Sequence, residues 1–166
     1  MYRLLILSIV LFSSALADVD QKECEKLFDP PAVRCCKKIA ELEDAFMKSA
    51  DIKECNQVNM DPALCEFDLC VAKKRGFATD DNKLDKTKIE VLMTKDFGAE
   101  ADLMKDLKSE CFNDNLGKYG PPELCDFIKI KNCLKIQMFK HCPDWEMNDA
   151  CNEIKGLAQE CGRTMF

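Results

Sequence analysis

Residues 124–142 read LCDFIKIKNCLKIQMFKHC, and this stretch predicts a long helix. Glycines and prolines between residues 117 and 122 mark a turn before it. We expect the helix to stop at Cys142, because Pro143 follows and the residue before a proline is biased away from the helical conformation. Alternating strand patterns are absent from the chain, so the fold is predicted to be all-α.

Helical spacing of apolar residues predicts six further helices around this one. No linker rich in Gly, Ser or Pro divides the chain, which favours a single domain. The expected elements are a short helix capped by Asp20 that ends before Asp29, a helix from Ala32 to about Ala50, a helix that begins at Asp61–Pro62 and ends at Gly76, and helices at about 86–95, 100–112 and 149–161, the last with Gly162 as its C-cap.

The first residues, MYRLLILSIVLFSSALADVD, have the three parts of a secretory signal peptide. A cation at Arg3 precedes an apolar run, and small residues follow at Ala15 and Ala17. The run is much shorter than the roughly 20 apolar residues that span a bilayer. We therefore expect residues 1–17 to be removed and residues 18–166 to form one secreted, extracellular domain without membrane insertion.

Without Arg3 the mature chain carries 23 basic and 30 acidic residues, a net charge of −7. Such a charge repels phosphate backbones, so nucleic acid is not expected as a partner. The oxygen-rich segment 79–90, TDDNKLDKTKIE, lacks the central glycine of a calcium loop. We expect the protein to use no metal and no cofactor.

The mature chain contains twelve cysteines. An even number behind a signal peptide indicates an oxidising compartment and six disulfides, although the sequence alone does not give their connectivity. Structural zinc is the alternative, but it favours Cys-x2-Cys pairs, which do not occur here. The cysteines are Cys24, Cys35, Cys36, Cys55, Cys65, Cys70, Cys111, Cys125, Cys133, Cys142, Cys151 and Cys161.

The segment 140–151, KHCPDWEMNDAC, holds the only histidine and the only tryptophan. Ser–His and Cys–His mechanisms need a nucleophile and an orienting acid at the imidazole ring. Every cysteine is expected to be oxidised, and nothing in the sequence places Asp144 or Glu146 on that ring. We therefore expect His141 to stand at a helix end and the protein not to be an enzyme. Trp145 is either a plug against the bundle or part of a cavity wall.

Methionine and phenylalanine side chains recur on the expected inward faces of these helices. In any helix bundle such residues form the core. Unbranched thioethers and aromatic rings also line adaptable pockets, so the residues alone leave both interpretations open. The set comprises Met60, Met93, Met104, Met138, Met147, Phe67, Phe97, Phe127 and Phe139.

The spacing of six cysteines resembles that of insect odorant-binding proteins. Residues 65–85, CEFDLCVAKKRGFATDDNKLD, also look like that family's third helix and following loop. Pro143, followed by Cys151 and Cys161, resembles the Plus-C subgroup. The match covers nearly all of the mature chain, and the six positions are Cys36, Cys65-x4-Cys70, Cys111 after a gap of 40, Cys133 after a gap of 21, and Cys142 in Cys133-x8-Cys142.

The resemblance implies a disulfide-stapled bundle of about six to eight helices around an apolar cavity. It also implies a monomer or homodimer that carries a small hydrophobic ligand through sensillum lymph or another body fluid, in some cases to a chemosensory receptor. The family's six cysteines pair first with third, second with fifth and fourth with sixth. The bonds implied here are Cys36–Cys70, Cys65–Cys133 and Cys111–Cys142, with the other six cysteines left unassigned.

The function predicted from these observations is that of a secreted carrier for odorants, pheromones or related lipophiles. The alternative is a secreted, disulfide-rich protein-binding module or protease inhibitor with a filled core, and a hydrolase based on His141 is a third hypothesis. The predicted pocket lining is Phe67, Val71, Leu92, Met104, Leu107, Phe127, Met138, Phe139 and Trp145.

Overall fold

The computed structural model describes residues 21–62 and 64–164, and within these residues the chain is helical and forms no strand. The predicted all-α fold is confirmed. The elements are α1 (Gln21–Glu25), the 3-10 helix η1 (Lys26–Phe28), α2 (Pro30–Val33), α3 (Lys37–Met47), α4 (Ala50–Cys55), α5 (Glu66–Lys74), α6 (Lys86–Phe97), α7 (Ala101–Asp106), the π-helix η2 (Leu107–Cys111), the 3-10 helix η3 (Gly117–Tyr119), α8 (Asp126–Lys140) and α9 (Asp149–Thr164).

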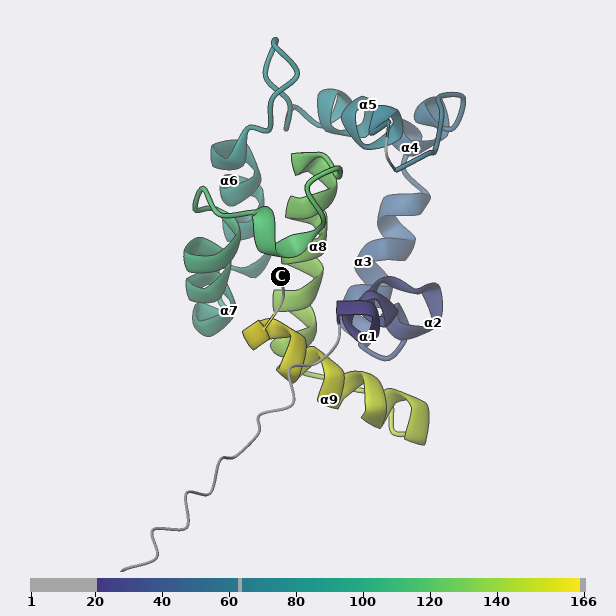
Figure 1. Ribbon diagram of the computed structural model, residues 1–166, viewed down its shortest axis with the longest axis vertical. Coiled ribbons are helices and arrows are strands. Elements are labelled where there is room, and N and C mark those ends of the chain that lie inside the picture. The colour runs from purple at the N-terminus through teal and green to yellow at the C-terminus, as the bar shows by residue number, and fades with distance from the viewer. Residues whose placement is uncertain (1–20, 63, 165–166) are drawn as a thin grey trace, which may run out of the picture.

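Helix α8 lies at the centre of the molecule (Figure 1). Helices α6 and α7 lie on one side of it and α3 on the other, while α5 packs near one end and α9 near the opposite end. The predicted long helix is thus confirmed, and it ends at Lys140, just before Cys142–Pro143. Because neighbours surround it, α8 buries much of its circumference, at Ile128, Lys129, Ile130, Cys133, Ile136, Gln137 and Phe139.

Helix α5 ends where the sequence predicts but begins four residues late. Gly76 has a φ of +72°, and the amide of Phe77 donates to the carbonyl of Ala72, which is the pattern of a Schellman C-cap. At the other end, the amide of Leu64 donates to the carbonyl of Asp61 and forms a turn instead of a first helical turn. The next residue, Cys65, has a left-handed φ of 57°, which separates this turn from the helix.

The helix predicted over 32–50 is divided into two. It breaks after α2 because Cys36 adopts an extended conformation and forms an isolated bridge with Trp145, so the helix resumes only at Lys37. Helix α4 was not predicted as a separate element. At the other end of the chain, α9 continues through Gly162, so the expected C-cap at that glycine is wrong.

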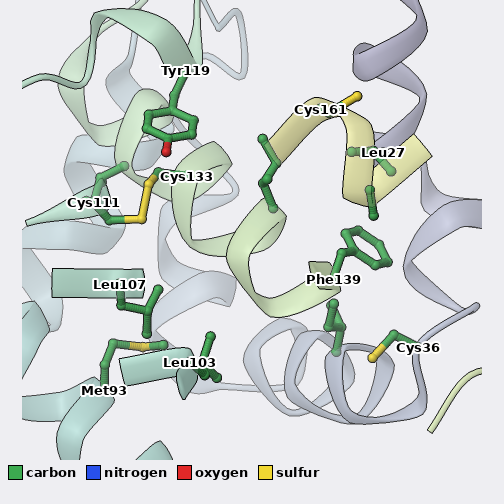
Figure 2. Packing of buried hydrophobic residues seen from close by; sticks show 14 of the residues in the cluster. Leu27, Cys36, Met93, Leu103, Leu107, Cys111, Tyr119, Cys133, Phe139 and Cys161 are labelled. Carbon is green, nitrogen blue, oxygen red and sulfur yellow. A yellow bond between two sulfur atoms is a disulfide. The ribbon is translucent and has the colours of Figure 1, made fainter. Parts of the chain in front are cut away.

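The buried side chains form one large core and one small one. The large core surrounds α8 and includes Leu107 and Phe139; Figure 2 shows these residues with the thioether of Met93 beside Leu107. The small core lies between α4 and α5, where Ile52, Cys55 and Val71 are buried. Val71, one of the predicted pocket residues, therefore lies in a cluster separate from the large core.

The predicted signal peptide, residues 1–17, and the expected cap Asp20 lie outside the described residues. Over 21–62 and 64–164, none of the helices combines the length and the apolar character needed to cross a membrane.

Candidate functional site

All twelve cysteines form disulfides, as expected, but the three implied bonds are wrong. Cys36 bonds to Cys142, whereas Cys65 and Cys111, expected to bond to Cys133 and Cys142, have other partners. The observed bonds are Cys24–Cys161, Cys35–Cys151, Cys36–Cys142, Cys55–Cys70, Cys65–Cys125 and Cys111–Cys133.

Three of these bonds interlock and involve only the six cysteines in the middle of the chain. Taken in order, the six pair first with third, second with fifth and fourth with sixth, which is the order that the resemblance implies for a different set. We call these bonds the inner frame, formed by Cys55–Cys70, Cys65–Cys125 and Cys111–Cys133.

The other three bonds join the N-terminal segment to the C-terminal segment. They are nested, so that each bond encloses the next, and we call them the outer clamp: Cys24–Cys161, Cys35–Cys151 and Cys36–Cys142.

Backbone contacts explain why Cys36 belongs to the outer clamp. The amide of Lys37 donates to the carbonyl of Asp144 at 3.2 Å, and the amide of Glu146 donates to the carbonyl of Cys35 at 2.9 Å. These two hydrogen bonds lay the Cys35–Cys36 pair against the segment after α8. Cys36 is therefore beside Cys142 and not beside α5.

Five of the predicted pocket residues contribute to the large core. Met104, Leu107 and Phe139 are buried there, and Met138 and Trp145 pack against it while partly exposed. The ring of Trp145 stacks on that of Phe139, with centroids 5.9 Å apart and planes 24° apart. Trp145 thus covers the core from outside, as a plug does.

The remaining four predicted pocket residues lie elsewhere. Phe67 and Val71 belong to the small core between α4 and α5. Leu92 and Phe127 are partly exposed and belong to neither cluster. The structure therefore does not bring the nine predicted residues together at one site.

Two pockets among the described residues are small. One has a volume of about 10 Å³ and lies where α3, α6, α7 and α8 meet, lined in part by Met138 and His141. The other, of about 50 Å³, lies between α2 and α3 beside Val33. Since a single water needs roughly 10–15 Å³ of such volume, these pockets accommodate a few waters at most. Met138 alone of the predicted lining contributes to either.

Polar side chains from α7, η2 and η3 contact side chains of α8 and its C-cap in two groups. In one group Asp106 contacts Lys140 and His141. In the other Tyr119 contacts Glu110 and Gln137. The disulfide Cys111–Cys133 also links η2 to α8. We call these six residues the polar seam: Asp106, Glu110, Tyr119, Gln137, Lys140 and His141.

Asp106 connects α7 to the C-terminal end of α8. Its Oδ2 accepts a hydrogen bond from Lys140 Nζ at 2.6 Å and lies 2.8 Å from His141 Nε2. Burial acts to raise the pKa of Asp106, but the hydrogen bonds from Lys140 and His141 outweigh it, so that pKa lies below its ordinary value of 3.8. His141 is at the helix end, as expected, yet its acidic partner is far away in sequence.

Gln137, in the second group of the polar seam, is fully buried. Its Nε2 donates to the hydroxyl of Tyr119 at 3.4 Å, and that hydroxyl donates to Glu110 Oε2 at 3.3 Å. Burial, helped by the negative charge of Glu110, raises the pKa of Tyr119, so the hydroxyl keeps its proton and remains a donor. The amide oxygen of Gln137, Oε1, has no hydrogen-bond partner in the structure.

The backbone on the other side of the seam is also unusual. Residues Leu107–Cys111 form a π-helix, and the amide of Phe112 donates to the carbonyl of Leu107. Such a turn is rare and often accompanies a functional site. Here it carries Glu110, which belongs to the polar seam, and Cys111, which bonds to Cys133 on α8.

Sequence reasoning missed every member of the seam except His141. The sequence shows only that Gln137 is a polar residue close to the apolar residues Ile136 and Phe139 on the predicted long helix. The partnership of Asp106 with His141 spans 35 residues and leaves no local pattern.

Comparison of the chain with family models, curated proteins and solved structures finds no significant match.

Proposed function

We propose that this protein is a secreted carrier that binds a small hydrophobic molecule within its large core. The observation that carries the proposal is the pairing order of the inner frame, which is the order implied by the resemblance to odorant-binding proteins. The signal-peptide pattern and six disulfides support secretion into an oxidising fluid.

The ligand would enter a core that is packed, so the binding cavity opens as the ligand arrives. Opening about 300 Å³ costs roughly 7 kcal/mol at about 24 cal/mol per Å³. Burial of apolar ligand surface returns about 25 cal/mol per Å², so a ligand that binds has to bury more than about 300 Å² to offset this cost. Met93 and Met104 lie in this core, and their unbranched side chains can repack around a guest.

Displacement of a fluorescent apolar probe tests this proposal. The oxidised protein should bind N-phenyl-1-naphthylamine saturably, and lipophiles should displace it. Met104→Trp adds bulk to the packed core, which hinders its opening, and should weaken probe binding about tenfold, which is about 1.4 kcal/mol. Met60→Trp is the matched control, because Met60 is 58% exposed, and it should leave binding unchanged. Absence of saturable binding over a broad panel of lipophiles would refute the carrier.

The small pockets favour a second candidate, a protein-binding module or protease inhibitor with a filled core. This candidate requires no opening of the interior. It predicts that no apolar probe binds and that a single extracellular protein is retained by the immobilised, oxidised domain. Probe binding that is sensitive to Met104→Trp would exclude the filled-core interpretation.

A further inference from the structure

The orientation of the buried Gln137 amide is assigned from the hydrogen bonds of its neighbours. Because the Tyr119 hydroxyl donates its one proton to Glu110, it can only accept from Gln137. Lys118 also donates to the same Glu110 oxygen, which keeps that carboxylate in place. If the amide were turned over, Gln137 Oε1 would face the Tyr119 hydroxyl oxygen, and both atoms would be acceptors. Nε2 therefore faces Tyr119, and Oε1 faces away from it.

This arrangement leaves a strong acceptor inside the large core. Tyr119 belongs to that core, so the amide that contacts it lies within the apolar interior of the bundle. Buried polar atoms without a partner are rare in folded proteins, and each one calls for a donor that completes it. Gln137 Oε1 is such an atom, in a residue with no exposed surface.

We propose that Gln137 Oε1 is the polar anchor of the ligand site and that it selects lipophiles bearing a hydroxyl group, such as long-chain primary alcohols. This inference rests on the carrier function proposed above. The ligand O–H donates to Oε1, and the apolar tail replaces core contacts between α7 and α8. A ligand of the same shape without a donor would leave the acceptor unpaired, and such a loss discriminates strongly between ligands.

A matched pair of ligands and a matched pair of proteins test the anchor. The ligands are 1-decanol and its methyl ether, which has a similar tail but no hydrogen-bond donor. The proteins are the wild type and Gln137→Met, whose side chain has nearly the same length and no amide. Gln159→Met is the control, because Gln159 is exposed on α9. Affinities are measured by displacement of N-phenyl-1-naphthylamine.

The wild type and Gln159→Met should bind the alcohol about tenfold more tightly than the ether. In Gln137→Met this ratio should fall to about one, while ether binding is retained. Equal binding of both ligands by the wild type overturns the anchor and leaves the carrier standing, and this comparison needs no variant to fold. A preference for the alcohol that persists in Gln137→Met overturns it as well. If the wild type binds neither ligand nor the probe, the carrier and the anchor both fail.

Discussion

The inner frame and the outer clamp each contain three disulfides, but they constrain the chain in different ways. Bonds of the inner frame cross one another and close segments of 15, 60 and 22 residues. Bonds of the outer clamp are nested, and their separations of 106, 116 and 137 residues differ by only 10 and 21. Once one clamp bond has formed, each of the others closes only a short additional loop.

This difference shows that sequence separation alone overstates what a nested disulfide contributes. In the chain-entropy description a bond stabilises according to the length of the loop that it closes. Cys35–Cys151 spans 116 residues but has Cys36–Cys142 beside it as a substitute. Cys65–Cys125 spans only 60 residues and has no parallel neighbour.

The largest expected effect follows from removing one bond of each kind. Cys65→Ala with Cys125→Ala should lower the free energy of unfolding by about 4 kcal/mol, and Cys35→Ala with Cys151→Ala by about 2.5 kcal/mol, although the second bond spans more residues. Urea denaturation of the two oxidised variants measures both values. Equal costs, or a larger cost for the clamp bond, would break the comparison.

A smaller effect on the free energy of unfolding is expected where α8, which carries Cys133 of the inner frame, contacts the segment that follows it in the outer clamp. Phe139 lies on α8, and Trp145 lies in the clamp segment that follows it, with their rings stacked. A double-mutant cycle of Phe139→Leu and Trp145→Leu should give a coupling free energy of about 1 kcal/mol, as expected for an aromatic pair.

A control cycle uses Val91 in the place of Phe139. Val91 lies on α6 and is 67% exposed. Val91→Ala and Trp145→Leu should be additive in the free energy of unfolding. If the coupling free energy of Val91 with Trp145 were as large as that of Phe139 with Trp145, the coupling would not come from the stacked pair of rings.

The smallest expected effect concerns Asp106 in the polar seam. Its folded pKa lies below 3.8, so the ionised form stabilises the fold at higher pH, and this contribution is lost as the pH falls through the lowered pKa. Wild type should exceed Asp106→Asn in stability by about 1 kcal/mol or less at pH 5. The difference should vanish near pH 2. A difference that is constant over this range in urea denaturation would show that charge plays no part.

The sequence allowed good prediction of helices whose signals are local. Gly76 ended α5 as expected, because a positive φ favours glycine, and Pro143 follows the end of α8. The same reasoning missed the late start of α5, since the left-handed conformation of Cys65 has no sequence signature. The break at Cys36 depends on backbone bonds to a segment about 110 residues away, which local patterns do not contain.

The disulfide pairing and the candidate site were harder to predict, because they too depend on contacts between residues that lie far apart in the sequence. Residue counting assigned Cys36 to the family pattern, whereas Cys55, on the unpredicted helix α4, takes the first place in the inner frame. Of the buried polar groups in the seam, Gln137 could be placed on a helix but not beside Tyr119, because that contact joins α8 to a 3-10 turn.

The pairing also determines what a protease can do to the molecule. Residues 80–83 are exposed on the loop that projects between α5 and α6 (Figure 1). Four of the six disulfides connect residues before this loop to residues after it, namely Cys24–Cys161, Cys35–Cys151, Cys36–Cys142 and Cys65–Cys125. A single cut there yields two polypeptides that stay covalently joined at four points, so hydrolysis of this exposed loop does not separate the halves of the protein.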